Sequence, residues 1–166
     1  RYHLTLLAMN NIGYKNLMKL STIANLQGFY HKPRIDHDLL ETYGDGLIVL
    51  SGCIGGEVGE HLRNYDPKKA EEIASWYKQQ FGDRYYFEIQ DHDWDEQKAV
   101  NSKLIDLAEK LDIELVITSD AHYCRKEDQE AHEILLCVQT GAFLSDPGRF
   151  TLKDTKLFVS DPKDIY

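Results

Sequence analysis

The chain has 166 residues, of which 42% are hydrophobic and 28% are charged, and its formal net charge is -9. This length and composition suit one globular domain, or a large piece of one, with a core of its own. The negative charge argues against a free-standing nucleic-acid-binding protein, because a phosphate backbone would be repelled at long range. No apolar run approaches the roughly 20 residues that a membrane helix needs, and no signal-peptide pattern opens the chain.

The cysteines and the two ends of the chain carry further information. Cys53, Cys124 and Cys137 are odd in number and show no disulfide spacing, which favours a reducing, cytoplasmic location. The chain opens without Met, and it ends in what resembles the first turn of a helix, with Asp161 as N-cap and Pro162 as first helical residue. Both ends therefore predict a piece of a longer polypeptide.

The first half of the chain begins with strand and helix signals in turn. In chain order we expect a strand, a helix, a short helix and a buried strand, at residues 3–9, 14–27, 38–43 and 46–50. A turn signal at residues 10–13 separates the first strand from the first helix. The glycine-rich segment SGCIGGEVG follows the second strand, and no helix is predicted there.

The second half of the chain continues the alternation. We expect a helix, a strand, a long helix, a strand and a final amphipathic helix, at residues 67–81, 85–90, 95–111, 113–118 and 127–139. Residues 141–166 are predicted to form a connector with a short strand at 157–159. Strands separated by helices predict an α/β protein with right-handed βαβ units and a parallel sheet. Periodicity does not choose between an open sheet and half of a barrel.

The loops after the strands are rich in side chains that bind metals, and function gathers at such loops in parallel α/β folds. Asp120 and His122 follow the strand at 113–118, and an extended segment projects side chains two positions apart to the same side. A carboxylate oxygen beside an imidazole nitrogen suits zinc or manganese. An N-cap aspartate and a surface histidine explain the same pair equally well.

Two further loops contain candidate side chains. Cys53 follows the strand at 46–50, where a lone cysteine is more often a small buried residue than a ligand. His31 lies beside Lys32 and Arg34 in a loop stiffened by Pro33. The two cations could bind a phosphate, Arg34 through its bidentate fork, although a solvated basic turn explains the pattern without a ligand.

The other histidines are weaker candidates. His132 lies inside the last predicted helix beside leucines, which favours a core or helix-face role. His3, His37 and His61 are predicted to lie at the surface. His92 follows a predicted strand and could line the same mouth of the sheet. The aromatic residues at 85–87 are interpreted as core.

Five segments in fixed order closely resemble the PHP (polymerase and histidinol phosphatase) domain of bacterial DNA polymerase III alpha subunits: GFYHKPRID, LIVLSGC, EIQDH, LVITSDAHY and AHEILLCVQTG. The resemblance covers essentially the whole chain. It implies part of a distorted (β/α)7 barrel whose mouth holds a metal cluster, often of zinc. Residues 1–140 would be the C-terminal portion of such a domain, and residues 141–166 a connector toward the polymerase core.

The resemblance also implies roles for particular side chains. By motif position it makes four residues metal ligands: His31, Cys53, Asp120 and His122. The metal would be zinc, with manganese or magnesium as alternatives, and Asp120 and His122 would also be catalytic. Lys32 and Arg34 would position a DNA phosphate. The implied activity is metal-dependent phosphoester hydrolysis, a 3′–5′ proofreading exonuclease attached to a DNA-directed DNA polymerase, which is a nucleotidyltransferase.

The sequence departs from the family in one respect: the family's opening His-x-His motif would precede Arg1, and no such motif occurs here. We therefore expect the chain alone to bind divalent metal weakly and to lack nuclease and polymerase activity, because a partial site is not preorganised. We also expect the four ligands to converge at one concave end of the sheet, where the C-terminal ends of parallel strands meet.

Two alternatives remain open. One is a stand-alone PHP phosphatase, such as a histidinol-phosphate phosphatase, with the same metals and a small substrate. The other is a non-catalytic PHP scaffold that docks a separate proofreading nuclease. In the polymerase interpretation the partners are DNA and other replicative polymerase subunits, including the sliding clamp and, for the scaffold, a proofreading subunit. No membrane partner is expected.

Overall fold

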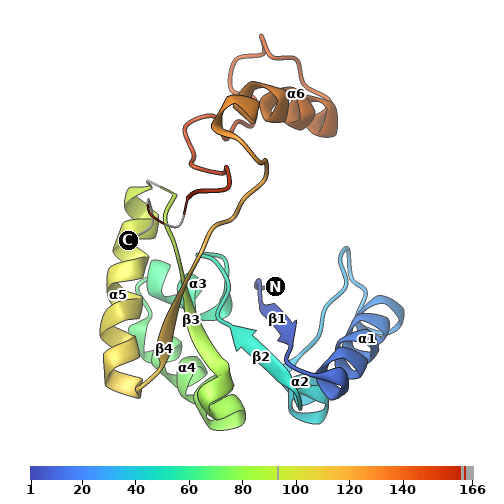
Figure 1. The fold of residues 1–166 in the computed structure, drawn as a ribbon, viewed down its shortest axis with the longest axis vertical. Coiled ribbons are helices and arrows are strands. Elements are labelled where there is room, and N and C mark those ends of the chain that lie inside the picture. Colours follow the sequence, from blue (N-terminus) through green and yellow to red (C-terminus); the bar gives the residue numbers. More distant parts are fainter. Residues whose placement is uncertain (93, 162, 164–166) are drawn as a thin grey trace. The chain divides into compact units, whose positions relative to one another are not determined.

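The computed structural model describes residues 1–92, 94–161 and 163 of the chain. The chain divides into two compact units. The first comprises Arg1–Ile89 and Val100–Val116, and the second comprises Gln90–Ala99 and Ile117–Tyr166. Within the described residues, strands and helices alternate and one sheet has the order β1-β2-β3-β4 (Figure 1). The α/β class predicted from the sequence is therefore confirmed, and the alternating units are consistent with a partial PHP barrel.

The elements in the described residues are as follows. The strands are β1 (Thr5–Ala8), β2 (Leu47–Leu50), β3 (Tyr85–Gln90) and β4 (Glu114–Thr118). The α-helices are α1 (Asn11–Leu26), α2 (His37–Tyr43), α3 (Glu57–Arg63), α4 (Pro67–Phe81), α5 (Asp95–Leu111) and α6 (Gln129–Thr140). Two short 3-10 turns are η1 (Gly82–Arg84) and η2 (Lys126–Asp128).

The predicted bounds of α4, β3 and α5 are confirmed, because local signals determine them. The Asp66 side chain accepts a hydrogen bond from the Lys69 amide and so caps α4. Pro67 occupies the first turn of α4, and Gly82 ends the helix at a positive φ of 59°. None of these three signals in α4 depends on distant parts of the chain.

Helix α1 begins at Asn11, earlier than predicted, because the expected turn is a helix cap. Asn10 Oδ1 accepts hydrogen bonds from the Ile12 amide at 2.9 Å and the Gly13 amide at 3.0 Å. Asparagine favours both turns and N-caps, so the sequence signal was ambiguous.

Helix α3 was not predicted, since its glycine-rich sequence lacks a side-chain N-cap. Val58 and Leu62 on this helix are only 1% and 3% exposed. Tertiary packing of this apolar face therefore stabilises a helix that propensity alone does not favour.

At the chain's end, the strand predicted at residues 157–159 reduces to a single parallel bridge between Tyr123 and Phe158. Asp161 Oδ1 accepts a hydrogen bond from the Lys163 amide, and Pro162 lies outside the described residues.

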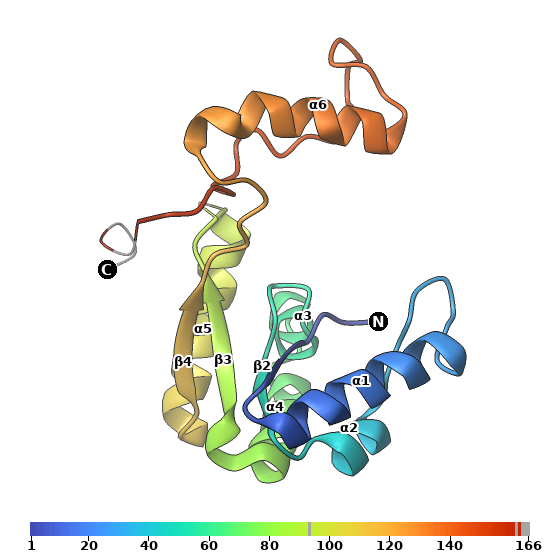
Figure 2. The same ribbon diagram turned by 45° about the vertical axis from the view of Figure 1, so that its right-hand side comes forward.

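The prediction of a fully parallel sheet is wrong at β1. Strand β2 is parallel to β3, but β1 is antiparallel to β2, with Ala8 opposite Leu47. The connection from β1 to β2 contains two helices, and its second helix returns the chain to the end where β1 stopped (Figure 2). The Met9 amide donates to the Gly46 carbonyl at 2.9 Å and joins the two ends of this connection.

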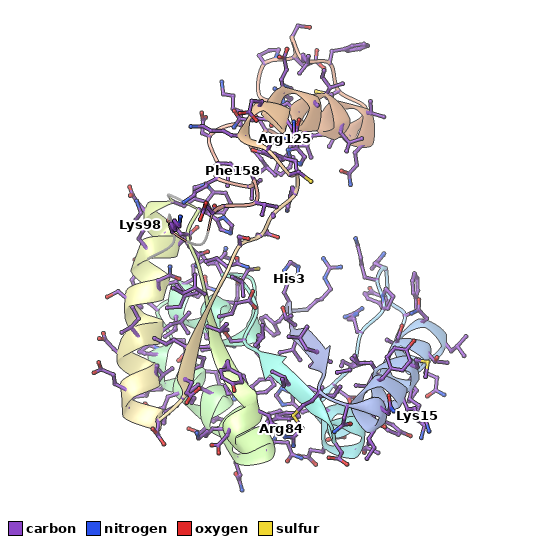
Figure 3. All side chains as sticks on the ribbon, in the orientation of Figure 1. His3, Lys15, Arg84, Lys98, Arg125 and Phe158 are labelled. Carbon is purple, nitrogen blue, oxygen red and sulfur yellow. The ribbon has the colours of Figure 1, made fainter. Side chains whose placement is uncertain are left out.

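The core lies in the first unit. One buried apolar cluster joins β2 and β3 to α3, α4 and α5. Tyr85 and Phe87 on β3 are 1% and 0% exposed, which confirms the core prediction for these two aromatic residues, whereas Tyr86 is half-buried and lies outside the core cluster. Arg84 Nη1 donates to the Gly44 and Leu47 carbonyls at 2.9 and 2.8 Å, so it links the starts of β2 and β3 (Figure 3).

In the second unit, a buried glutamate ties the segment after α6 to the helix. Glu133 is 5% exposed, and its carboxylate lies 2.7 Å from Arg149 Nη1. It also accepts hydrogen bonds from Thr151 Oγ1 at 2.5 Å and the Leu152 amide at 2.9 Å. Burial alone would raise the pKa of Glu133, but the hydrogen bonds from Thr151 and Leu152 and the Arg149 guanidinium hold the pKa below 4.5.

We expect Glu133→Gln to destabilise the fold by about 2 kcal/mol, because it leaves Arg149 half-buried without its anionic partner. Since the folded-state pKa is lowered, the carboxylate's contribution is present above pH 4.5 and is lost as the pH falls through the folded-state pKa. Urea denaturation at a series of acidic pH values should therefore show a weaker acid dependence in Glu133→Gln. The exposed Glu130 on the same helix provides the control substitution Glu130→Gln. Equal acid dependence in both variants would contradict the assignment.

Candidate metal centre

Cys53 lies in the loop that follows β2, and its thiol faces a histidine from the start of the chain. The Sγ atom is 3.2 Å from His3 Nδ1 and accepts a hydrogen bond from the Gly55 amide at 3.4 Å. Gly52 adopts a positive φ of 80°, and a Cβ there would lie 2.8 Å from the His3 carbonyl oxygen. Glycine at this position therefore allows the loop backbone to approach the segment that carries His3.

His3 was predicted only as a surface residue, and the structure shows it exposed but also in contact with Cys53. Figure 3 labels His3 ahead of β1. The antiparallel register places Thr5 opposite Leu50, so the start of β1 lies beside the end of β2. A parallel arrangement would have separated the two side chains. The sequence signal that could have identified His3 is its position just before the first strand.

His31, Lys32 and Arg34 lie in the loop between α1 and α2. His31 is exposed, its φ is 61°, and its ring packs edge-on against Tyr30 at 4.5 Å between centroids. A positive φ is uncommon for a residue with a side chain. Lys32 is exposed, whereas Arg34 is half-buried. The Arg34 guanidinium lies 4.6 Å from the centroid of the Tyr30 ring and donates to the Tyr30 carbonyl at 2.9 Å.

A cavity of about 860 Å³ in the first unit is lined in part by Lys32 and Arg34. His3 and a hydrogen-bonded group of His37, Glu57 and Tyr77 also line this cavity. His37 Nε2 lies 2.9 Å from Glu57 Oε2, and Tyr77 Oη donates to the same oxygen at 3.2 Å. Burial, and then the Glu57 charge, raise the pKa of Tyr77.

His37 was predicted to be a surface residue, and its side chain is 37% exposed, but the prediction did not include its contacts with Trp76 and Glu57. Its ring is half-buried and stacks on Trp76, with 3.9 Å between ring centroids and 11° between ring planes. The two residues are far apart in sequence, so helical or strand periodicity could not indicate this contact.

Asp120 and His122 lie together in the second unit, in the loop after β4. Asp120 Oδ1 is 3.4 Å from His122 Nε2, and both side chains are exposed. The His122 amide donates to the Leu157 carbonyl at 2.8 Å, which fixes the loop. The His132 ring on α6 packs against His122, with 5.3 Å between centroids, in agreement with its predicted helix-face role.

His92 is buried, at 4% exposed, and its ring nitrogens contact protein oxygens. Nε2 lies 3.1 Å from Gln90 Oε1 and Nδ1 lies 3.4 Å from the Lys156 carbonyl oxygen. These contacts favour a structural role for His92.

The observed pairs have the chemistry and spacing of neighbouring metal ligands. Two nitrogen or oxygen ligands about 2.0 Å from a tetrahedral zinc ion lie about 3.3 Å apart, and a nitrogen and a sulfur ligand lie about 3.5 Å apart. The Asp120–His122 distance of 3.4 Å and the His3–Cys53 distance of 3.2 Å are close to these values. These separations are equally those of the hydrogen bond between His3 and Cys53 and of the ion pair between Asp120 and His122, so metal binding by either pair belongs to the proposal below.

The four predicted ligands fall into two groups. His31 and Cys53 belong to the first unit, whereas Asp120 and His122 belong to the second. Among the residues that the structure describes, no three His, Cys, Asp or Glu side chains form a group that could hold a metal ion. The convergence of all four ligands stays a prediction.

Comparison with known proteins identifies the family of the chain. Residues 1–92, which make up more than half of the chain, match the PHP domain family. The chain therefore belongs to that family. PHP domains are generally metal-dependent.

No helix in the described part of the chain is long and apolar enough to span a membrane.

The similarity to individual proteins extends beyond the PHP match. The chain is 43% identical to the DNA polymerase III subunit alpha of Deinococcus radiodurans over 164 residues, which is 99% of this chain and 12% of that protein. The corresponding protein of Treponema pallidum is 45% identical over 165 residues (99% of this chain, 14% of that protein). That of Thermus aquaticus is 43% identical over 164 residues (99% and 13%). The chain thus spans only a small part of these relatives.

Proposed function

We propose that the chain is part of the alpha subunit of a bacterial replicative DNA polymerase. Residues 1–140 would form the C-terminal portion of its PHP domain, and residues 141–166 the connector toward the polymerase core. Sequence identity of 43 to 45% over 99% of the chain to alpha subunits of three bacteria supports this proposal. The whole protein would add nucleotides to DNA in the cytoplasm, with the sliding clamp and other replicative subunits as partners.

We further propose that this region contributes to a metal-dependent phosphoesterase site that releases nucleotides from a DNA 3′ end. The Asp120–His122 pair, at 3.4 Å in a loop after a strand, is the observation that carries this proposal. Asp120, His122, His31 and Cys53 would hold the metal, and the contact with Cys53 adds His3 to the candidates. A bound divalent ion would supply Lewis-acid chemistry for phosphoester hydrolysis.

The other side chains would bind and orient the DNA. Lys32 is exposed and can present its ammonium group to a phosphate oxygen. The Arg34 guanidinium is already held over Tyr30, so it would stiffen the loop as well as attract the phosphate.

The test uses the full-length protein that contains this chain. Wild-type protein should release nucleotides from a labelled 3′ end, a chelator should stop the release, and zinc or manganese should restore it. Cys53→Ser should weaken metal binding by about 10-fold or more, because a hydroxyl replaces a thiolate ligand. Bound metal is measured by atomic absorption after dialysis, and Cys124→Ser, at an exposed cysteine, is the control.

The possible outcomes distinguish the proposed function from its alternatives. Tight metal binding without nuclease activity would favour the non-catalytic scaffold. Hydrolysis of a small phosphate ester without nucleotide addition would favour a stand-alone phosphatase. A wild-type protein with neither bound metal nor chelator-sensitive nuclease activity would refute the local site.

A further inference from the structure

Two loops with candidate site residues are each followed at once by a short helix, and one side-chain pair joins those helices. His37 is the first residue of α2, directly after the loop that carries His31, Lys32 and Arg34. Glu57 is the first residue of α3, shortly after Cys53. The His37 Nε2 to Glu57 Oε2 distance is 2.9 Å.

The Glu57 side of this contact is anchored on the core. Glu57 is 20% exposed by its side chain and accepts a second hydrogen bond from Tyr77 Oη at 3.2 Å. Tyr77 is 3% exposed and belongs to the buried apolar cluster of the first unit. Glu57 therefore has a position set by both α3 and α4.

The His37 side is held by ring contacts as well as by the carboxylate. Its ring stacks on Trp76 at 3.9 Å between centroids and meets the Tyr77 ring edge-on at 5.4 Å. These contacts leave His37 with one orientation, in which Nε2 faces Glu57.

Helix α2 depends on tertiary contacts for its stability. It has 7 residues, and Leu40 is its buried residue. Isolated helices of this length are marginal, so tertiary contacts must hold them. The preceding loop is held by the Tyr30 amide to Lys32 carbonyl hydrogen bond of 3.1 Å, by Ile35 against the core, and by the Asp36 side chain, which caps α2 at the Leu39 amide. Because His37 is the first residue of α2, its contact with Glu57 sets the position of the end of this loop.

We propose that His37 is a positioning residue, whose contact with Glu57 sets the loop at residues 29–36 relative to the loop at residues 51–56. It thereby determines where Lys32 meets a DNA phosphate relative to Cys53. Lys32, Arg34, His37 and Glu57 line the same cavity of the first unit, so a shift of α2 changes that cavity directly. The role in DNA binding rests on the proposed function, whereas the coupling of the two loops does not.

Two substitutions in the full-length protein separate the hydrogen bond from the ring stacking. His37→Phe keeps an aromatic ring on Trp76 but has no N–H, and His37→Arg keeps a donor for Glu57. We expect His37→Phe to raise KM for 3′-end release by about 10-fold with kcat little changed, because misplaced binding groups weaken productive binding. His37→Arg should restore KM to near the wild-type value. Glu57→Leu, which removes the acceptor that glutamine would keep, should resemble His37→Phe, and the double variant should be no worse than either, because both remove one interaction.

Amide hydrogen exchange provides a readout that does not depend on nuclease activity. His37→Phe and Glu57→Leu should both speed exchange in residues 29–36 and 51–56. Tyr77→Phe, which removes the other hydrogen bond to Glu57, should leave both loops near wild-type exchange. If wild-type protein has no nuclease activity, the proposed function fails, and the exchange result still decides the coupling. Unchanged exchange in His37→Phe, a response in one loop only, or failure of His37→Arg to restore protection would overturn the inference.

Discussion

Asp120→Asn in the full-length protein should abolish metal-dependent release of 3′ nucleotides and leave nucleotide addition largely intact. Asparagine keeps the size of the side chain but removes the negative charge that helps to hold a divalent ion beside His122, 3.4 Å away. We expect a loss of at least about 100-fold in the release rate, because metal-assisted hydrolysis depends on the bound ion. Both activities would be measured on the same primer–template preparation. Asp154→Asn, at an exposed turn in the same unit, is the matched control.

The thermal midpoint with and without chelator distinguishes a catalytic from a structural metal. An ion that binds only the native state stabilises it by mass action, so its removal should lower the midpoint. Wild-type release rates in Asp120→Asn would show that the catalytic assignment of this loop is wrong. Collapse of both activities together with the midpoint would make the metal structural and would support the scaffold alternative.

Gly13→Ala should destabilise the first unit by about 3 kcal/mol or more, in the range typical of severe overpacking. An ideal Cβ at this position would lie 1.9 Å from the Gly46 carbonyl oxygen and 2.5 Å from the carbonyl carbon. Both partners are backbone atoms, so no side-chain rotation relieves the clash. The Met9 amide to Gly46 carbonyl hydrogen bond, 2.9 Å long, holds the two segments together at this point.

The control for Gly13→Ala is Gly55→Ala, where the nearest neighbour of the added methyl group would be Cys53 Sγ at 3.6 Å. This is an ordinary van der Waals contact, so we expect a change in stability of less than about 1 kcal/mol. Urea denaturation of both variants measures the difference. Similar stabilities for Gly13→Ala and Gly55→Ala would show that α1 and the start of β2 are not as close as the structure places them.

Local chemistry was sufficient for much of the secondary structure and for the family. Helix α4 could be bounded because Asp66, Pro67 and Gly82 act on their own neighbours in sequence. Strand β3 was recognisable from its run of aromatic and β-branched residues. The family followed from five motifs in order, and the match of residues 1–92 to the PHP domain confirms it.

The same kind of reasoning failed where packing outweighs propensity. Helix α3 contains Gly59 and begins after Gly56, so its sequence resembles a loop. Its helical form depends on burial of Val58 and Leu62 against the core. Local preference is a weak prior, and the apolar contacts that outweigh it come from residues far away in sequence.

The direction of β1 and the partners of the histidines were decided by tertiary structure alone. The alternation of strands and helices predicts parallel neighbours, but two helices between β1 and β2 reverse the expected direction. That reversal brings His3 to Cys53, and the packing of α2 against the core brings His37 to Glu57. Sequence alone thus determined which residue types stand at the strand ends, because composition and spacing are local properties. Which of them touch was decided by chain direction and packing, since these depend on contacts between residues far apart in the sequence.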